Sequence, residues 1–325
     1  MLGSTVSREI EIVRVLCVTA MMWVHVSPGL SAASIVTTGE YHLVGTVFGD
    51  TLGRISVSLL SFVSGYLFWL RSAGRLFGQI AHRRFVTIIV PMLVWSALYL
   101  LLVSAKTFAS DVPAASIEKI GPTVWDMINA WTGLAATTAN TSLFFLRDLF
   151  VVTLIATILR PVIVHFPTSL AAGVIFLGSF DVFAPIVFRA NIMQMFLLGA
   201  ITARQGYSLS DLSRPMIALP LGYLITVLSL ALIEKPELMG PMTSEFPSFL
   251  RRAGIGFLML AIVASYVSLL PGTRLARLGR HAFLAYLMHV PLNSRLWLAC
   301  EERGGPADQR SYALFLLLAP CDACS

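Results

Sequence analysis

Charged residues are scarce in this chain. Only 12% of its 325 residues are Asp, Glu, Lys or Arg, whereas soluble domains carry about 25%. Hydrophobic residues make up 57% of the chain, and its mean hydropathy is +0.80. These values exclude an ordinary soluble domain and indicate an integral membrane protein. The net charge of +6 therefore does not indicate a nucleic-acid partner, because in a membrane protein the location of the positive residues carries the information.

Cysteines are also few, and their positions favour neither a redox centre nor a metal site. Cys17 and Cys300 lie in or beside apolar runs, where a packing role is expected. Cys321 and Cys324 form a C-x-x-C pair at the end of the sequence, without a βαβ context or a second ligand pair. We therefore expect no metal site.

Long apolar runs dominate the chain. A membrane-spanning helix needs about 20 mostly apolar residues. Candidate runs cover residues 10–26, 52–70, 85–104, 143–160, 168–181, 184–203, 215–233, 252–270, 280–299 and, in part, 311–320. The sequence predicts an all-α polytopic membrane helix bundle of about ten helices with an incomplete last one, in a single transmembrane domain over 1–325. The first run opens among charged residues, so we expect a retained helix and not a cleaved signal peptide.

The basic residues predict the orientation of the bundle. With the N-terminus in the cytoplasm, the segments on that side contain most arginines, whereas the loop 27–51 contains no Lys or Arg. These arginines are Arg8, Arg14, Arg71, Arg75, Arg83, Arg84, Arg160, Arg204, Arg214, Arg274, Arg277 and Arg280. The distribution satisfies the positive-inside rule, although Arg251 and Arg252 run against it. We expect a multi-pass protein of the plasma membrane, the bacterial inner membrane in particular, with a cytoplasmic N-terminus.

The first run carries a cation near one end and an imidazole near the other. Arg14 and His25 are eleven residues apart in "RVLCVTAMMWVH". Eleven helical steps return to within about 20° of the same face and advance about 16 Å along the axis. Glu11 lies three residues before Arg14, close to that face. Two interpretations follow: a functional polar face inside the bundle, or an arginine that snorkels to head groups with a boundary histidine.

Further polar residues occur at membrane depth, where a charge costs about 2.5 kcal/mol or more. Arg54 lies at the start of the second run, and that run contains Ser64-Gly65-Tyr66. Its small residues favour close helix packing.

Arg147 and Asp148 of the fourth run are adjacent, about 100° apart on a helix. Partners on other helices are therefore expected, within either a structural ion network or a binding site. His289 shares a face with Tyr286 near Pro291, as a structural or a functional residue. Arg189 is a further charged residue of this kind and lies within the sixth run.

A basic loop is expected between the second and third runs. It reads "RSAGRLFGQIAHRRF" and contains Arg71, Arg75, Arg83 and Arg84. One interpretation is a topology signal that contacts acidic lipids. The other is a clamp for the phosphates of an anionic cytoplasmic donor, with Arg83 and Arg84 at the start of the third helix.

Taken in order, several stretches resemble acyltransferase family 3, the integral-membrane O-acyltransferases. The first helix carries the family's Arg, ten residues, then His, as Arg14 and His25, with Glu11 where the family usually has Asp. Similar segments over residues 8–295 are "RISVSLLSFVSGYLF", "HRRFVTIIVPMLVW", "FFLRDLF", "MFLLGA" and "LGRHAFLAYLMHVPL". In "FFLRDLF", Phe144 stands where Trp is common in the family.

The resemblance implies a ten-helix bundle that moves an acyl group, often acetyl, from cytoplasmic acyl-CoA to a hydroxyl of an envelope or exported saccharide, in polysaccharide modification. It implies His25 and Arg14 as catalytic residues. Substrate binding is predicted for Glu11, Arg54, Tyr66, Arg83, Arg84, Arg147, Asp148 and His289. The expected partners are membrane lipid and a saccharide or lipid-linked glycan; acyl-CoA is a donor substrate, and no bound cofactor is expected. The sequence gives no oligomeric state.

The last run departs from the family pattern. Residues 311–320 are too few to span a bilayer, which predicts a truncated, altered or re-entrant final segment. Two alternatives therefore accompany the acyltransferase. One is a transporter or flippase of a glycan or lipid-linked intermediate that uses the same polar interior, and the other is an inactive, truncated family member.

Overall fold

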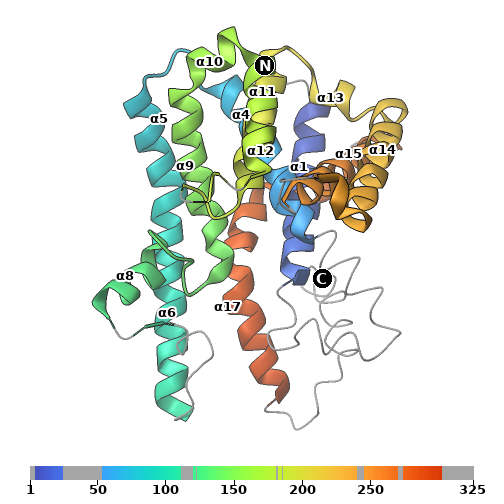
Figure 1. Cartoon of the computed structure of the whole chain (residues 1–325). Helices are drawn as coiled ribbons and strands as arrows, with labels where there is room; N and C mark the ends of the chain where they lie inside the picture. Colours follow the sequence, from blue (N-terminus) through green and yellow to red (C-terminus); the bar gives the residue numbers. More distant parts are fainter. Residues whose placement is uncertain are drawn as a thin grey trace.

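The computed structural model describes residues 4–24, 53–110, 120–121, 123–180, 182–184, 186–239, 245–269 and 274–301. Its longer helices are α1 (Ser4–Val24), α4 (Arg54–Arg71), α6 (Val90–Ser110), α9 (Phe144–Ile158), α11 (Pro167–Gly178), α12 (Ala190–Arg204), α14 (Pro215–Glu234), α15 (Glu245–Leu269) and α17 (Ala282–Glu301) (Figure 1). Short helices are α5 (Phe77–Arg84), η2 (Phe85–Ile89), α8 (Val124–Thr132), η3 (Thr141–Leu143), α10 (Arg160–His165), α13 (Leu209–Leu212), η4 (Pro236–Met239), α16 (Arg274–Leu278) and η5 (Gly279–His281). The described part confirms the predicted all-α bundle.

Several of these helices have membrane character. Within the described residues, four stretches are long and apolar enough to cross a bilayer: Phe77–Ala105, Thr141–Ile158, Pro215–Glu234 and Glu245–Leu269. The outward surface of α14 is almost wholly apolar, with Leu224 and Tyr223 among its most exposed side chains. Such a face is stable in lipid and not in water. The chain is therefore a membrane protein. The predicted run 311–320 lies outside the described residues.

Helices α4 and α12 form the centre of the bundle. A Cβ atom at Gly65 would lie 1.9 Å from the carbonyl oxygen of Phe196, and one at Gly199 would lie 2.0 Å from that of Phe62. The two backbones therefore approach so closely that only glycine fits at either position. The Asn191 amide also donates a hydrogen bond of 2.6 Å to the Ser58 hydroxyl across this interface. The small residues of the second run act as close-packing residues, as predicted.

One end of the bundle gathers many of its basic residues. The N-terminus, α5, α10 and α13 all lie at this end (Figure 1). Arg160 donates to the Ser72 carbonyl at 2.9 Å, and Arg204 donates to the Val164 carbonyl at 3.3 Å, so the loops at this end are joined by arginine side chains. This arrangement agrees with the sequence expectation that these residues share one side of the membrane.

The predicted basic loop is partly helical, which corrects the sequence interpretation. The chain turns back at Gly74, which has a φ of 72°, and α5 begins at Phe77. The π-helical segment η2 then joins α5 to α6, and the Val90 N–H bonds to the Phe85 carbonyl. Pro91 has no N–H for the carbonyl four residues earlier, and a wider turn at this point accommodates that loss. Arg83 and Arg84 thus have fixed positions on a continuous helical path.

A short helix packs beside the first turns of α6, where the sequence predicts only a loop. Helix α8 begins with a capping box, in which the Thr123 N–H and hydroxyl donate to Asp126 at 3.0 and 2.5 Å. These bonds hold the pKa of the Asp126 carboxyl below its ordinary value. Gly133 ends α8 in the left-handed conformation, at a φ of 66°. The Trp131 indole bonds to the Leu93 carbonyl at 3.0 Å and attaches α8 to α6.

Candidate active site

A central cavity of about 480 Å³ lies between α1, α4, η2, α9 and α17. Its polar lining is formed by Glu11, Arg14, Ser64, Arg84 and Thr87. Apolar side chains of α9 and α17 line the remainder, including Phe145 and Tyr286. Of the predicted site residues, the structure therefore brings Glu11, Arg14 and Arg84 together. The π-helical segment contributes to this wall, because Thr87 and Ile88 both belong to η2.

The Arg14–Glu11 ion pair lies in the wall of the cavity. Arg14 Nη1 donates to Glu11 Oε1 at 2.9 Å, and the side chains are 33% and 23% exposed. Because the pair is three residues apart on one helix, it holds the guanidinium in place while leaving part of it accessible. Glu11 Oε2 is buried against η5, where a Cβ atom at Gly279 would lie 2.5 Å from it. The absence of a side chain at Gly279 therefore lets η5 pack directly against Glu11 of α1.

We expect Gly279→Ala to disturb this ion pair. The added methyl would also lie 2.6 Å from the Glu11 carbonyl oxygen, so α1 and η5 must separate. We expect acyl transfer to fall about tenfold or more, in line with the cost of misplacing catalytic groups. Gly256→Ala in α15 is the matched control, because a Cβ atom there meets nothing within 4 Å. Equal acyl transfer by both variants would show that Gly279 does not position the pair.

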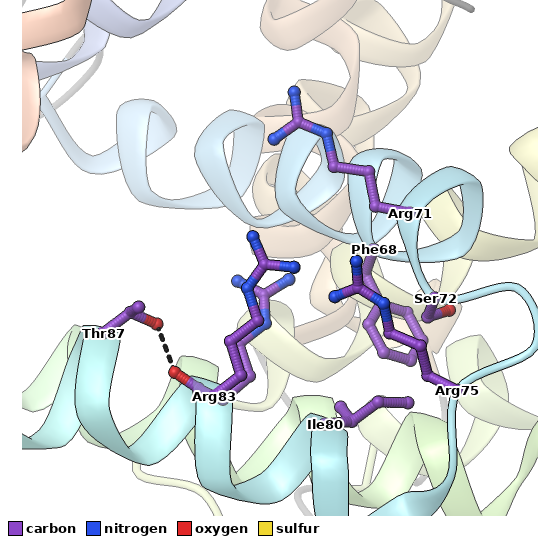
Figure 2. A pocket seen from close by; sticks show the side chains of 8 residues that line it. Phe68, Arg71, Ser72, Arg75, Ile80, Arg83 and Thr87 are labelled. Atoms are coloured by element: carbon purple, nitrogen blue, oxygen red, sulfur yellow. Dashed lines mark hydrogen bonds between the residues drawn. The ribbon is translucent and has the colours of Figure 1, made fainter.

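A basic pocket of about 140 Å³ adjoins this cavity. It is lined by Phe68, Arg71, Ser72, Arg75, Ile80, Arg83, Arg84 and Thr87. In Figure 2 the labelled arginines come from α4, the following loop and α5, and their guanidinium groups gather over a floor of Phe68 and Ile80. Arg84 and Thr87 line both spaces, so the basic pocket continues into the central cavity. The sequence grouped these four arginines in one basic segment with a phosphate clamp as one interpretation, and the structure places all four around one pocket.

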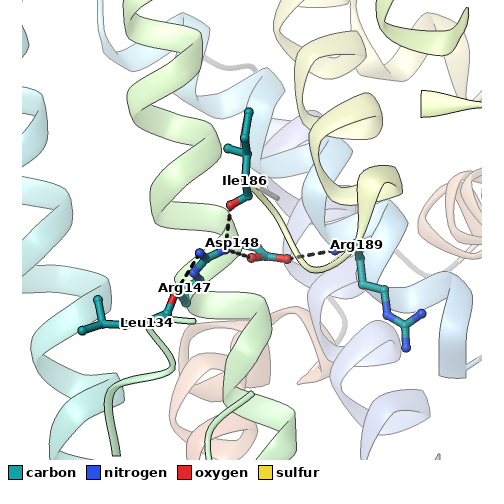
Figure 3. A network of polar contacts seen from close by, with 5 residues as sticks. All are labelled: Leu134, Arg147, Asp148, Ile186 and Arg189. Carbon is teal, nitrogen blue, oxygen red and sulfur yellow. Dashed lines mark hydrogen bonds and ion pairs between the residues drawn. The ribbon is translucent and has the colours of Figure 1, made fainter. Parts of the chain in front are cut away.

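The Arg147–Asp148 pair has a different setting from the one predicted. The two neighbours pair with each other at 2.8 Å, although partners on other helices were expected. Arg147 also donates to the Ile186 and Leu134 carbonyls at 2.8 and 3.2 Å, and the Arg189 N–H donates to Asp148 at 3.2 Å (Figure 3). The network ties the loops that flank α9 and α12 to the start of α9. Neither side chain lines the central cavity.

This network predicts a difference between two arginines. Asp148 has an exposed fraction of 0%, so Arg147→Ala would leave a buried carboxylate without its cation. Removal of one partner of such a pair costs about 3–5 kcal/mol, and we expect a marked drop in thermal stability in detergent. Arg189→Ala is the control, because that residue contributes its backbone N–H and its side chain is exposed. Equal melting temperatures for the two variants would contradict this assignment.

Tyr66 and His289 lie outside the cavity lining. The Tyr66 hydroxyl donates to the Tyr207 carbonyl and accepts from the Leu209 N–H, both at 3.3 Å. It thereby joins α4 to the loop before α13. His289 is buried, with Nδ1 at 2.5 Å from the Tyr286 carbonyl oxygen. The Tyr286 hydroxyl in turn donates to the Ser142 carbonyl. A substrate-binding role for Tyr66 and His289 stays a prediction.

His25 lies outside the described residues, and so does the side chain of Arg54. Helix α1 is continuous from Arg14 to Val24, the residue before His25. The helical spacing that placed Arg14 and His25 on one face thus applies up to that residue. The assignments of His25 and Arg54 stay predictions from the sequence.

The fold and site define a membrane-embedded helix bundle with an internal polar cavity that continues into a basic pocket. Comparison with known proteins gives the family: the model of acyltransferase family 3, an acyltransferase domain, matches residues 7–299, so the chain belongs to this family and is an acyltransferase. The chain is 24% identical over 333 residues to succinoglycan biosynthesis protein ExoH of Rhizobium meliloti (strain 1021), which covers 98% of this chain and 86% of that protein. No solved structure matches it.

Proposed function

We propose that the protein transfers an acyl group, acetyl in the simplest case, from cytoplasmic acyl-CoA to a hydroxyl of an exported saccharide. The observation that carries this proposal is the joined pair of spaces, which runs from four arginines through Arg84 and Thr87 to the Arg14–Glu11 pair. The arginines suit the phosphates of a nucleotide thioester. The larger and mostly apolar central cavity suits its uncharged arm. The printed name of the Rhizobium relative, a succinoglycan biosynthesis protein, supports a saccharide acceptor.

His25 is proposed as the general base. Imidazole titrates near neutral pH and can accept the proton of a hydroxyl as its oxygen attacks the thioester carbonyl. The C–O bond forms, the C–S bond breaks, and the thiolate of coenzyme A leaves and takes up a proton. Eleven residues of continuous helix correspond to about 16 Å along the axis. On that expectation from the sequence, Arg14 has a role on the donor side.

The transition state of this reaction develops negative charge on the carbonyl oxygen, which needs a positive group or hydrogen-bond donors. Arg14, Arg54 and Arg147 were the candidates from the sequence. Arg147 already donates to Asp148 and to two carbonyl groups, so its guanidinium is engaged. Arg14 uses Nη1 for Glu11 and remains one-third exposed toward the cavity. The engagement of Arg147 disfavours it for the oxyanion, and Arg14 and Arg54 stay candidates from the sequence.

Mass spectrometry of exported saccharides from cells with and without the gene tests the proposed function. We expect an ester-linked acyl group on the saccharide that is lost with the gene and returns with the wild-type chain. A transporter or flippase would instead leave unmodified saccharide inside the cell and little outside. Unchanged export together with unchanged acylation would contradict the proposal.

A further inference from the structure

The basic pocket holds more positive charge than an ordinary structural network requires. Arg71, Arg75, Arg83 and Arg84 all line it, and among the described residues no carboxylate does. Within the described part of the chain, none of the four forms an ion pair, whereas Arg14, Arg147 and Arg214 each have an acidic partner. Four like charges around one small space repel one another, so the cluster is suited to a ligand with several negative charges.

A neutral hydrogen-bond donor completes this pocket. Ser72 is 4% exposed and lines the pocket, and its hydroxyl has no hydrogen-bond partner in the part of the chain that the structure describes. The backbone of Ser72 is held in place by Arg160, which donates to the Ser72 carbonyl at 2.9 Å. The Arg160 guanidinium also lies over the Trp69 ring, 5.4 Å from its centroid. A buried hydroxyl without a partner costs free energy unless a ligand atom satisfies it. Phosphate oxygens accept hydrogen bonds from both serine and arginine.

The order of residues along the two joined spaces gives the pocket a direction. Arg84 and Thr87 lie at the junction with the central cavity, whereas Arg71 and Arg75 line the basic pocket alone. Arg83 also lines only the basic pocket, but it is the neighbour of Arg84 on α5. In a coenzyme A thioester the acyl-bearing arm is attached to the diphosphate, and the 3′-phosphate lies on the ribose, beyond the diphosphate. An arm that enters the central cavity therefore leaves the diphosphate near Arg84 and the 3′-phosphate on the side of Arg71 and Arg75.

We propose that Arg71, Arg75 and the Ser72 hydroxyl form a subsite for the 3′-phosphate of coenzyme A, while Arg83 and Arg84 bind the diphosphate (Figure 2). The inference rests on the proposed acyl-CoA donor and adds that the protein selects coenzyme A against donors that lack the third phosphate. An acidic lipid head group shares the phosphate chemistry, and the experiment separates the two sources.

The test measures binding by the purified full-length protein in nanodiscs of phosphatidylcholine. The probes are coenzyme A, 3′-dephospho-coenzyme A and 4′-phosphopantetheine. We expect coenzyme A to bind about tenfold or more tightly than its dephospho form, the affinity change that one charge-assisted hydrogen bond provides. The double variant R71Q/R75Q should lose this difference, and R83Q should weaken binding of both nucleotides. Ser72→Ala should reduce the difference in part.

Arg214→Gln is the matched control. It removes one positive charge at the same end of the molecule, from an exposed arginine that pairs with Asp211 at 2.7 Å. We expect it to bind all three probes as the wild type does. Equal affinities of the wild type for coenzyme A and its dephospho form would overturn the proposal. So would an R71Q/R75Q variant that keeps the full difference but no longer retains phosphatidylglycerol, because the arginines would then bind lipid.

The outcome is independent of the acyl-transfer assay. A protein that binds coenzyme A more tightly than its dephospho form but acylates no saccharide would support the phosphate subsite and contradict the proposed function. Saccharide acylation by a protein that does not discriminate would do the reverse.

Discussion

His25→Ala is expected to abolish acylation of the exported saccharide while the amount of folded protein in the membrane stays unchanged. General base catalysis contributes about 10²–10⁴-fold to a rate, so residual transfer should lie at or below about 1% of the wild-type level. The measurement is ester-linked acyl content of the saccharide by mass spectrometry, with membrane protein quantified in the same cells.

His165→Ala is the matched control for this substitution. His165 ends α10 at the basic end of the bundle and is exposed, with Nδ1 at 2.8 Å from the Pro161 carbonyl oxygen. Its loss should leave acylation at the wild-type level. Acylation by His25→Ala equal to that of His165→Ala would remove His25 from the mechanism.

Gly199→Ala is expected to have a large effect on folding. The new methyl would lie 2.0 Å from the Phe62 carbonyl oxygen and 3.0 Å from the Tyr66 nitrogen, and both contacts are with backbone, which cannot rotate away. Helices α4 and α12 must therefore move apart, at a cost of about 3 kcal/mol, the upper part of the range for overpacking. Much less folded protein should be recovered from the membrane, as measured by size-exclusion chromatography in detergent.

Gly173→Ala in α11 separates this close approach from a general intolerance of glycine replacement. A Cβ atom at Gly173 meets nothing within 4 Å, and alanine favours a helix over glycine by about 1 kcal/mol. That variant should be at least as stable as the wild type. A Gly199→Ala protein with wild-type yield and melting temperature would contradict the close packing of α4 on α12.

The helices were predictable because an apolar run of bilayer length can form few structures other than a membrane-spanning helix. The run 215–233 became α14 with nearly the same bounds, and 143–160 became α9. The first residue of a helix was less predictable where polar residues lie within that helix. Helix α15 begins at Glu245 and not at residue 252, because its first turns contain Arg251 and Arg252 and the apolar pattern is visible only beyond them.

The site was predictable only where its residues are neighbours on one helix. Helical spacing placed Glu11 beside Arg14, and the structure gives that pair. The meeting of Arg71 with Arg84 depends on the turn at Gly74, and the contact of Gly279 with Glu11 joins residues far apart in the chain. The helical periodicity of the sequence does not predict contacts between residues of different elements. The prediction that Arg147 pairs with a residue of another helix was also wrong. Its flexible side chain reaches the adjacent Asp148 and the loop carbonyl groups.

The central proposal is that the acyl group enters from the side of the basic pocket and leaves on the opposite side. Proteoliposomes with the protein in one orientation, fixed by protease accessibility of its N-terminus, test it most directly. Labelled acetyl-CoA is supplied only on the N-terminal side, and saccharide from cells that lack the gene only on the other side. We expect labelled ester on the saccharide, and none with His25→Ala. Labelled ester that forms only when donor and saccharide share one side would contradict transfer through the bundle.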